Sequence, residues 1–179
     1  MKSTTNTGLL IVDVQGNLAK QVYDSEKVIS STVTLIQCCK LLDIPIVVVE
    51  QYPQGLGATV PEIATLVEDT PHFAKMHFSA LAEKQIADYF ATTSLTYWLV
   101  VGIEAHVCVY QTVMALLDKA FVVEVVRECI SSRELSNKEL AVSVLQKAGA
   151  NITSVEMCIF ELMKTCEHPN FKAVLALLK

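Results

Sequence analysis

Three reactive side chains, Asp13, Lys75 and Cys108, each fall close behind a hydrophobic segment of the chain. A cysteine attacks carbon through its thiolate, which an ammonium group or a helix N-terminus stabilises. A carboxylate can take the thiol proton and later return it to a leaving group. These residue types together are those of a nucleophilic hydrolase that needs no histidine. Each also has an ordinary explanation as a turn cap, a solvated lysine or a core cysteine.

The segments around these residues predict how they are positioned. Apolar, β-branched runs predict strands at 8–14, 45–50, 72–76, 96–102, 121–126 and 151–155. Amphipathic stretches predict helices at 24–42, 61–67, 79–91, 106–119 and 137–147, and two short helices separated by Pro169. This alternation is typical of an α/β fold, with a parallel sheet covered on both faces. Ligands bind at the carboxyl edge of such a sheet, where all three reactive residues would lie.

Length and composition indicate a single globular domain over residues 1–179. The net charge of −5 with no basic patch argues against nucleic acid as a partner. The mean hydropathy of +0.42 is high, but no apolar run approaches the about 18 residues that cross a bilayer. We therefore expect no membrane partner, and attribute the apolar excess to a doubly buried sheet or to an interface between copies.

The N-terminal segment and the cysteines predict a cytoplasmic protein with reduced thiols. Residues 1–8 are polar and lack the hydrophobic segment of a signal peptide. The six cysteines are not spaced as the CxxC pairs of a zinc site. In a reducing compartment such cysteines stay free. We expect neither a metal nor a cofactor.

The motifs around the three reactive residues resemble the isochorismatase-like hydrolase family. The matching segments are Leu9 to Gln15, Lys75 with Phe78-Ser79, and Gly102 to Val109 with Thr112. The stretch 101–109, with Arg127 and 131–133, is most similar to the isochorismatase-domain-containing branch. The resemblance covers nearly the whole chain. It implies a Rossmann-like, three-layer α/β/α fold with a six-stranded parallel sheet, and it places the catalytic triad of the family on Asp13, Lys75 and Cys108.

The resemblance also implies an oxyanion site beside the nucleophile. The family commonly has a non-proline cis peptide there, which by position is the Ile103–Glu104 bond of this chain. That bond turns backbone N–H groups, here of Glu104 and Cys108, toward a substrate oxygen. Glu104 stands where many amidases of the family have a small or hydroxyl residue. A carboxylate so near the nucleophile opposes thiolate formation unless it points away.

The resemblance further implies a small-molecule substrate with an amide, carbamoyl or related C–N bond, and a homo-oligomer of two or more copies. Nicotinamidases carry Asp and His metal ligands after the second strand, where this chain reads Glu50-Gln51-Tyr52, so no metal is expected. Gln15, Tyr52 and Phe78 are candidate substrate contacts, although loop stabilisation or core packing explains them equally well. His106 lies two residues before Cys108 and faces another side of a helix, which favours a structural role.

Two functions remain open on these grounds. The first is hydrolysis through a covalent intermediate on Cys108, with Asp13 as the base and Lys75 as the third member. The second is a non-catalytic binding or scaffold protein on the same fold, because a fold does not determine a function.

Overall fold

The computed structural model contains one sheet of six strands in the order β3-β2-β1-β4-β5-β6, and every neighbouring pair is parallel. The structure describes residues 2–179, so Met1, the first residue of the segment considered above as a leader, lies outside the described residues. The predicted six-stranded parallel sheet is confirmed. Its strands are β1 (Thr7–Val12), β2 (Ile46–Gln51), β3 (His72–Lys75), β4 (Tyr97–Ile103), β5 (Val122–Ser131) and β6 (Asn151–Thr153).

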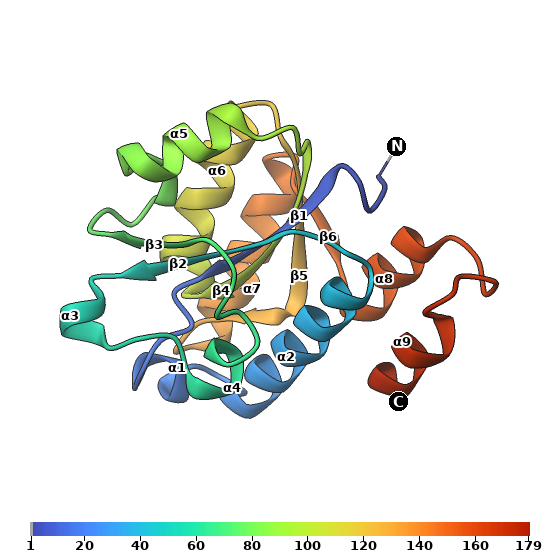
Figure 1. The fold of residues 1–179 in the computed structure, drawn as a ribbon. Coiled ribbons are helices and arrows are strands. Elements are labelled where there is room, and N and C mark those ends of the chain that lie inside the picture. Colours follow the sequence, from blue (N-terminus) through green and yellow to red (C-terminus); the bar gives the residue numbers. More distant parts are fainter. Residues whose placement is uncertain (1) are drawn as a thin grey trace.

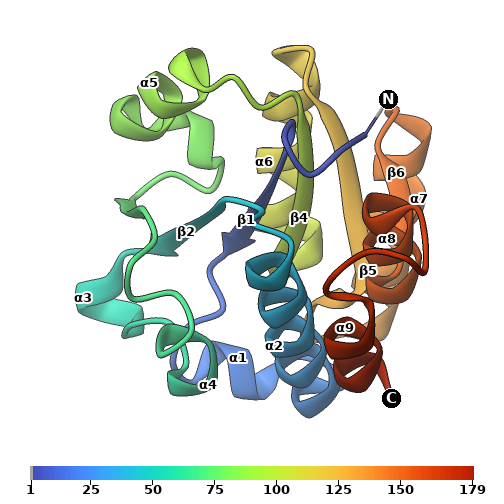
Figure 2. The ribbon, with the colours of Figure 1, turned by 45° about the vertical axis from the view of Figure 1, so that its right-hand side comes forward.

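Helices cover both faces of the sheet, which confirms the three-layer α/β/α architecture. One face packs against α1 (Leu18–Gln21), α2 (Ser25–Leu41), α4 (Pro61–Ala64), α8 (Val155–Met163) and α9 (Phe171–Leu178). The other packs against α5 (Lys84–Thr92), α6 (Tyr110–Asp118) and α7 (Leu135–Lys147). Figure 1 shows α2 in front of the sheet and α6 behind it, and Figure 2 shows the same layers after a turn of 45°. Among residues 2–179, no helix has both the length and the apolar character needed to cross a bilayer.

Strand β1 shows why the apolar runs of the sequence are continuous rather than alternating. Leu9 and Ile11 pack into the core on the α2 side, whereas Leu10 and Val12 pack into the core on the α6 side. All four side chains are fully buried. A parallel sheet covered on both faces buries every residue of a central strand, so no polar positions interrupt the run.

The strand order reverses between β1 and β4, and this reversal defines the place of the candidate site. The chain runs outward from β1 through β2 to β3, returns to β4 beside β1, and continues through β5 to β6. In open parallel sheets, ligands bind beyond the carboxyl ends of the strands at such a switch point. Asp13 follows β1 and Cys108 follows β4, so both lie at this position.

Gly102 allows β1 and β4 to approach each other closely at the switch point. Its φ of +124° is one that side-chain-bearing residues rarely adopt, and an added Cβ would lie 1.9 Å from the Val12 carbonyl oxygen.

We expect Gly102→Ala to lower the free energy of unfolding by at least about 3 kcal/mol, measured by urea denaturation. Gly149→Ala is the matched control. Gly149 also has a positive φ, but its Cβ would meet nothing within 4 Å, so a cost of about 1–2 kcal/mol is expected. Equal costs would contradict this explanation.

The helix predicted over 79–91 is broken in the structure. A 3₁₀ helix over Ala80–Ala82 precedes α5, and the extended residue Glu83 separates the two. The Glu83 carboxylate accepts a 2.7 Å bond from the Met76 backbone N–H and lies 2.8 Å from His77 Nδ1. Because Glu83 bonds back to the end of β3, it leaves the helical path.

The helix predicted over 106–119 begins instead with a π-helical turn over Ala105–Val109, and α6 follows from Tyr110. Strand β5 is also longer than the predicted 121–126, because it continues through Arg127 and Glu128 to Ser131. The pairing of β4 with β5 shifts register between Val100 and Gly102. A strand with such an irregularity accommodates the charged residues Arg127 and Glu128.

Candidate active site

A buried ion pair lies at the carboxyl edge of the sheet. Asp13 directly follows β1 in a left-handed conformation, with φ of 54°, and Lys75 is the last residue of β3. The Lys75 Nζ donates to Asp13 Oδ2 at 2.6 Å, and the two side chains are 0% and 2% exposed. A buried charge without a partner is costly, so each of these groups depends on the other.

Cys108 adds a thiol to this pair from the turn after β4. Its side chain is buried and interacts with both Asp13 and Lys75. The other carboxylate oxygen, Asp13 Oδ1, is buried and has no partner of good hydrogen-bond geometry among residues 2–179. This oxygen is therefore open to accept the thiol proton. The structure thus brings together the three residues that the sequence analysis singled out.

The resting state of Cys108 differs from the expected stabilised thiolate. Burial and, after it, the Asp13 charge raise the pKa of the Cys108 thiol to about 12, although Lys75 opposes both effects. The neutral thiol is therefore the resting form, because burial and Asp13 outweigh the ammonium. Burial also raises the pKa of Asp13, although Lys75 opposes this shift. A carboxylate with a raised pKa is a stronger base than an exposed one.

Glu104 is turned away from the nucleophile. Its carboxylate accepts bonds from the Arg133 backbone N–H at 3.0 Å and from Arg133 Nε at 3.2 Å. The largest causes of the raised Cys108 pKa are burial and the charge of Asp13, and Glu104 is not among the main ones. A carboxylate at this position was expected to oppose thiolate formation unless it points away from the thiol, and here it binds Arg133 instead. The Ile103–Glu104 peptide bond is cis, as the resemblance implied.

Gln15, a candidate substrate contact, is fully buried and bonded to the loop that follows β2. Its Nε2 donates to the carbonyls of Gln51 at 3.0 Å and Gly57 at 2.6 Å. Its Oε1 accepts from the Gln51 backbone N–H at 2.7 Å. Both ends of the amide are thus occupied, and these contacts are those of the loop-stabilising alternative.

The two aromatic candidates lie on the same edge of the sheet as the ion pair. Tyr52 is 46% exposed, and its backbone N–H donates to the Lys75 carbonyl at 2.8 Å. Phe78 follows β3 and is 55% exposed. Their contact with a substrate remains a prediction. His106 Nδ1 lies 2.9 Å from the Ser132 hydroxyl oxygen, a structural hydrogen bond of the kind expected for it.

Gln51 is a site residue that the sequence analysis did not single out. Its Oε1 accepts a bond from Lys75 Nζ at 2.8 Å, so Lys75 has two side-chain partners. The sequence signal was the position of Gln51 at the end of β2, one strand from both Asp13 and Lys75. Position 51 was compared only with the metal ligands of nicotinamidases, and that comparison does not predict a role for the Gln51 amide.

The segment where nicotinamidases carry metal ligands has another role in this chain. Glu50 Oε1 accepts 2.7 Å bonds from the backbone N–H and from the hydroxyl of Thr59, which fastens the loop between them. Within residues 2–179, no group of three or more His, Cys, Asp or Glu side chains is arranged to hold a metal ion.

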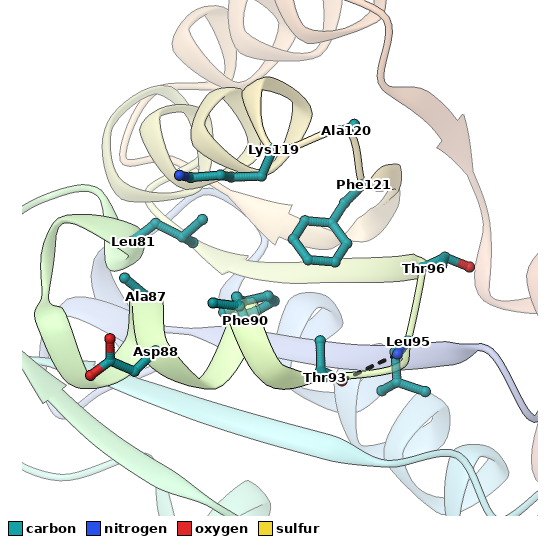
Figure 3. Close-up of a pocket in the computed structure, with 11 residues that line it drawn as sticks. Leu81, Ala87, Asp88, Phe90, Thr93, Leu95, Thr96, Lys119, Ala120 and Phe121 are labelled. Atoms are coloured by element: carbon teal, nitrogen blue, oxygen red, sulfur yellow. Dashed lines mark hydrogen bonds between the residues drawn. The ribbon is translucent and has the colours of Figure 1, made fainter.

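A hollow of about 530 Å³ lies at the opposite edge of the sheet, at the amino ends of β4 and β5. Figure 3 shows Phe90 and Phe121 lining it, and their ring centroids are 5.7 Å apart. None of Asp13, Lys75 and Cys108 lines it. This hollow is therefore separate from the candidate active site.

Comparison with known sequences decides the family. The family model described as Isochorismatase domain matches residues 7–157. The chain belongs to the isochorismatase-like hydrolase family. It is 39% identical over 177 residues to the secreted isochorismatase effector Isc1 of Phytophthora sojae, an alignment that covers 96% of this chain and 83% of that protein. It is 32% identical to isochorismatase domain-containing protein 2 of Homo sapiens, over 96% of this chain and 82% of that protein.

Solved structures agree with the family assignment. The MAR1 ribonuclease from Caenorhabditis elegans superposes with a TM-score of 0.93 at 36% identity, over 99% of this chain and 91% of that one. The YcaC gene product of Escherichia coli, described as an octameric hydrolase of unknown specificity, has a TM-score of 0.91 at 22% identity, over 99% of this chain and 88% of that one. At that identity the second likeness shows the shared fold alone.

Proposed function

We propose that this protein is a cysteine-dependent hydrolase that cleaves an amide, carbamoyl or related C–N bond of a small molecule. Cys108 is the nucleophile, Asp13 is the base and Lys75 is the third member. One observation carries the proposal: a buried carboxylate, held 2.6 Å from an ammonium, contacts a thiol at the switch point of the sheet. Membership of a hydrolase family supports it.

The geometry supports proton transfer during the attack rather than before it. As the Cys108 sulfur bonds to the carbonyl carbon, Asp13 Oδ1 takes the thiol proton. The carbonyl oxygen becomes an oxyanion, which the backbone N–H groups of Glu104 and Cys108 stabilise. Asp13 then gives the proton to the leaving nitrogen, the C–N bond breaks, and an acyl thioester remains on Cys108.

Hydrolysis of the thioester completes the cycle. Asp13, ionised again, removes a proton from water as the water oxygen attacks the acyl carbon. The C–S bond then breaks, the acid leaves, and the proton returns to the Cys108 sulfur. Throughout these steps Lys75 keeps the buried carboxylate paired and stabilises negative charge as it moves onto sulfur.

The proposal is tested with a panel of small amides, carbamoyl compounds and esters. The protein is mixed with each compound, quenched in acid within seconds, and digested for peptide mass spectrometry. We expect one compound class to be turned over and to leave an acyl adduct on the Cys108 peptide. Turnover with an adduct on another cysteine would overturn the assignment of the nucleophile. No turnover of any compound would favour the binding or scaffold alternative.

Phosphodiester cleavage is a second candidate function, favoured by the description of a solved relative. A chain that is 36% identical over 99% of this protein is described as a ribonuclease. The net charge of −5 opposes tight binding of a polyanion. Labelled single-stranded RNA is therefore incubated with the wild type and with Cys108→Ser. If the wild type cleaves RNA and Cys108→Ser does not, the bond cleaved at this site is a phosphodiester bond rather than a C–N bond.

Self-association and location are further proposals. We propose a homo-oligomer that buries exposed apolar side chains around the carboxyl edge of the sheet, namely Tyr52, Leu56, Met76 and Phe78. Multi-angle light scattering of the purified protein tests this, and a monomer at micromolar concentration would contradict it.

We also propose a cytoplasmic location, which cell fractionation tests. The Phytophthora sojae relative is described as secreted, so recovery outside the cell is the contrary result.

A further inference from the structure

Lys75 is held from two sides, and only one of its partners is charged. Its Nζ lies 2.6 Å from Asp13 Oδ2 and 2.8 Å from Gln51 Oε1. The Gln51 Nε2 donates to the Met76 carbonyl at 2.9 Å, which fixes which end of the amide faces the ammonium. The long, flexible lysine side chain is thereby restricted to a position beside Asp13 and Cys108.

Gln51 is itself held by a second amide. Gln15 bonds to both backbone polar groups of Gln51, since its Nε2 donates to the Gln51 carbonyl and its Oε1 accepts from the Gln51 N–H. Gln15 is fully buried. A chain of contacts therefore runs from Gln15 through Gln51 to Lys75 and on to Asp13. The first link joins the Gln15 side chain to the Gln51 backbone, and the other two join side chains.

We propose that Gln51 is a positioning residue, whose neutral amide directs the Lys75 ammonium at Asp13 and Cys108 without adding negative charge to the site. This inference rests on the proposed function, because it assigns a role within the same group of residues. The Gln51 side chain makes no hydrogen bond to the sulfur or to the Asp13 carboxylate among those found in residues 2–179, whereas the Gln51 backbone does interact with that carboxylate.

The neutral charge of Gln51 matters because the site holds one ammonium and one carboxylate. A carboxylate at position 51 would accept the same bond from Lys75, but it would pair the ammonium twice and add repulsion to a thiolate. It would also face the Met76 carbonyl with an oxygen in place of the amide donor. An apolar residue at position 51 would remove the bond and leave the charge count unchanged.

The test measures how fast Cys108 is alkylated by iodoacetamide, with peptide mass spectrometry on the full chain and exposed Cys166 as the internal reference thiol. Below the thiol pKa, the rate of alkylation at fixed pH follows the thiolate fraction and falls tenfold for each unit by which the pKa rises.

Between pH 7 and 9 we expect Gln51→Glu to slow alkylation of Cys108 about tenfold. Gln51→Met should slow it about threefold, because Lys75 is no longer directed. Gln54→Glu, the matched control, adds the same charge at an exposed residue of the short helix α3 (Pro53–Leu56), just beyond β2, and should change nothing.

The outcomes separate this inference from the proposed function. If Lys75→Met slows Cys108 but both Gln51 variants react like the wild type, Gln51 positions nothing and the inference is wrong. If Lys75→Met also leaves the rate unchanged, the proposed function itself fails. Circular dichroism and thermal unfolding identify folded variants, and Gln51→Met, which adds no charge, decides the question should Gln51→Glu not fold.

Discussion

A Cys108→Ser variant is expected to lose hydrolysis of any substrate found in the panel by about 10⁴-fold or more. A serine hydroxyl is a far weaker acid than a thiol, and the site was built around sulfur, so Asp13 cannot activate it. The free energy of unfolding should change by less than about 1 kcal/mol, because serine is nearly isosteric with cysteine and Asp13 Oδ1 can accept from its hydroxyl. Initial rates and urea denaturation measure the two effects.

The matched control for this prediction is Cys166→Ser. Cys166 is the exposed cysteine of the chain, whereas Cys38, Cys39, Cys129 and Cys158 are buried like Cys108. The control should retain full activity and stability. Hydrolysis that persists in Cys108→Ser, with the same dependence on Asp13, would mean that the carboxylate attacks directly or activates water without a covalent step.

A Lys75→Met variant is expected to lose about 3–5 kcal/mol of stability together with its activity. Methionine has a similar length but leaves the Asp13 carboxylate buried and unpaired. The pKa of Asp13 is already raised by burial and would rise further without Lys75, which now opposes that shift. A protonated Asp13 cannot take the thiol proton, so kcat should fall by at least about 10³-fold.

The stability of this variant should depend on pH with a definite sign. A carboxyl whose pKa is raised by folding favours the folded state at low pH and opposes it as the pH rises through the folded-state pKa. The stability deficit of Lys75→Met should therefore shrink as the pH is lowered toward the ordinary carboxyl range. Urea denaturation at several pH values measures this, and a deficit that grows on acidification would contradict the description of the pair.

Removing both charges separates stability from catalysis. The double variant Asp13→Asn with Lys75→Met contains no buried charge at this position, so it should recover much of the stability lost in Lys75→Met. Its activity should stay at the level of the inactive single variants. Recovered activity in the double variant would show that the ion pair serves folding alone.

Much of the site follows from residue types and strand ends. Asp13 and Lys75 end apolar runs, and parallel strands covered on both faces bring such ends to one edge. Cys108 lies a few residues beyond a third run. The alternation of strands and helices predicts the architecture. The cis Ile103–Glu104 bond came only from the resemblance, because no local pattern of residues distinguishes a cis from a trans peptide there.

The remaining features depend on long-range contacts that local patterns do not encode. Gln51 reads as part of a polar loop, and its role emerges only when β2 pairs with β3 and places it beside Lys75. Glu83 sits in a good helical pattern, but its bonds to the end of β3 break the helix. The resting thiol differs from expectation because the sequence shows which charges are present, but not how deeply Cys108 is buried.

The most direct test of the central claim compares the rate of Cys108 alkylation in two variants, one that removes the negative charge beside the thiol and one that removes the positive charge. Asp13 raises the pKa of the thiol and Lys75 lowers it. At a fixed pH high enough to keep Asp13 ionised, Asp13→Asn should therefore speed iodoacetamide labelling of Cys108 and Lys75→Met should slow it. We expect each change to be at least about tenfold relative to Cys166 in the same sample. Shifts in the same direction, or no shift in either variant, would contradict the account of a thiol governed by these two groups.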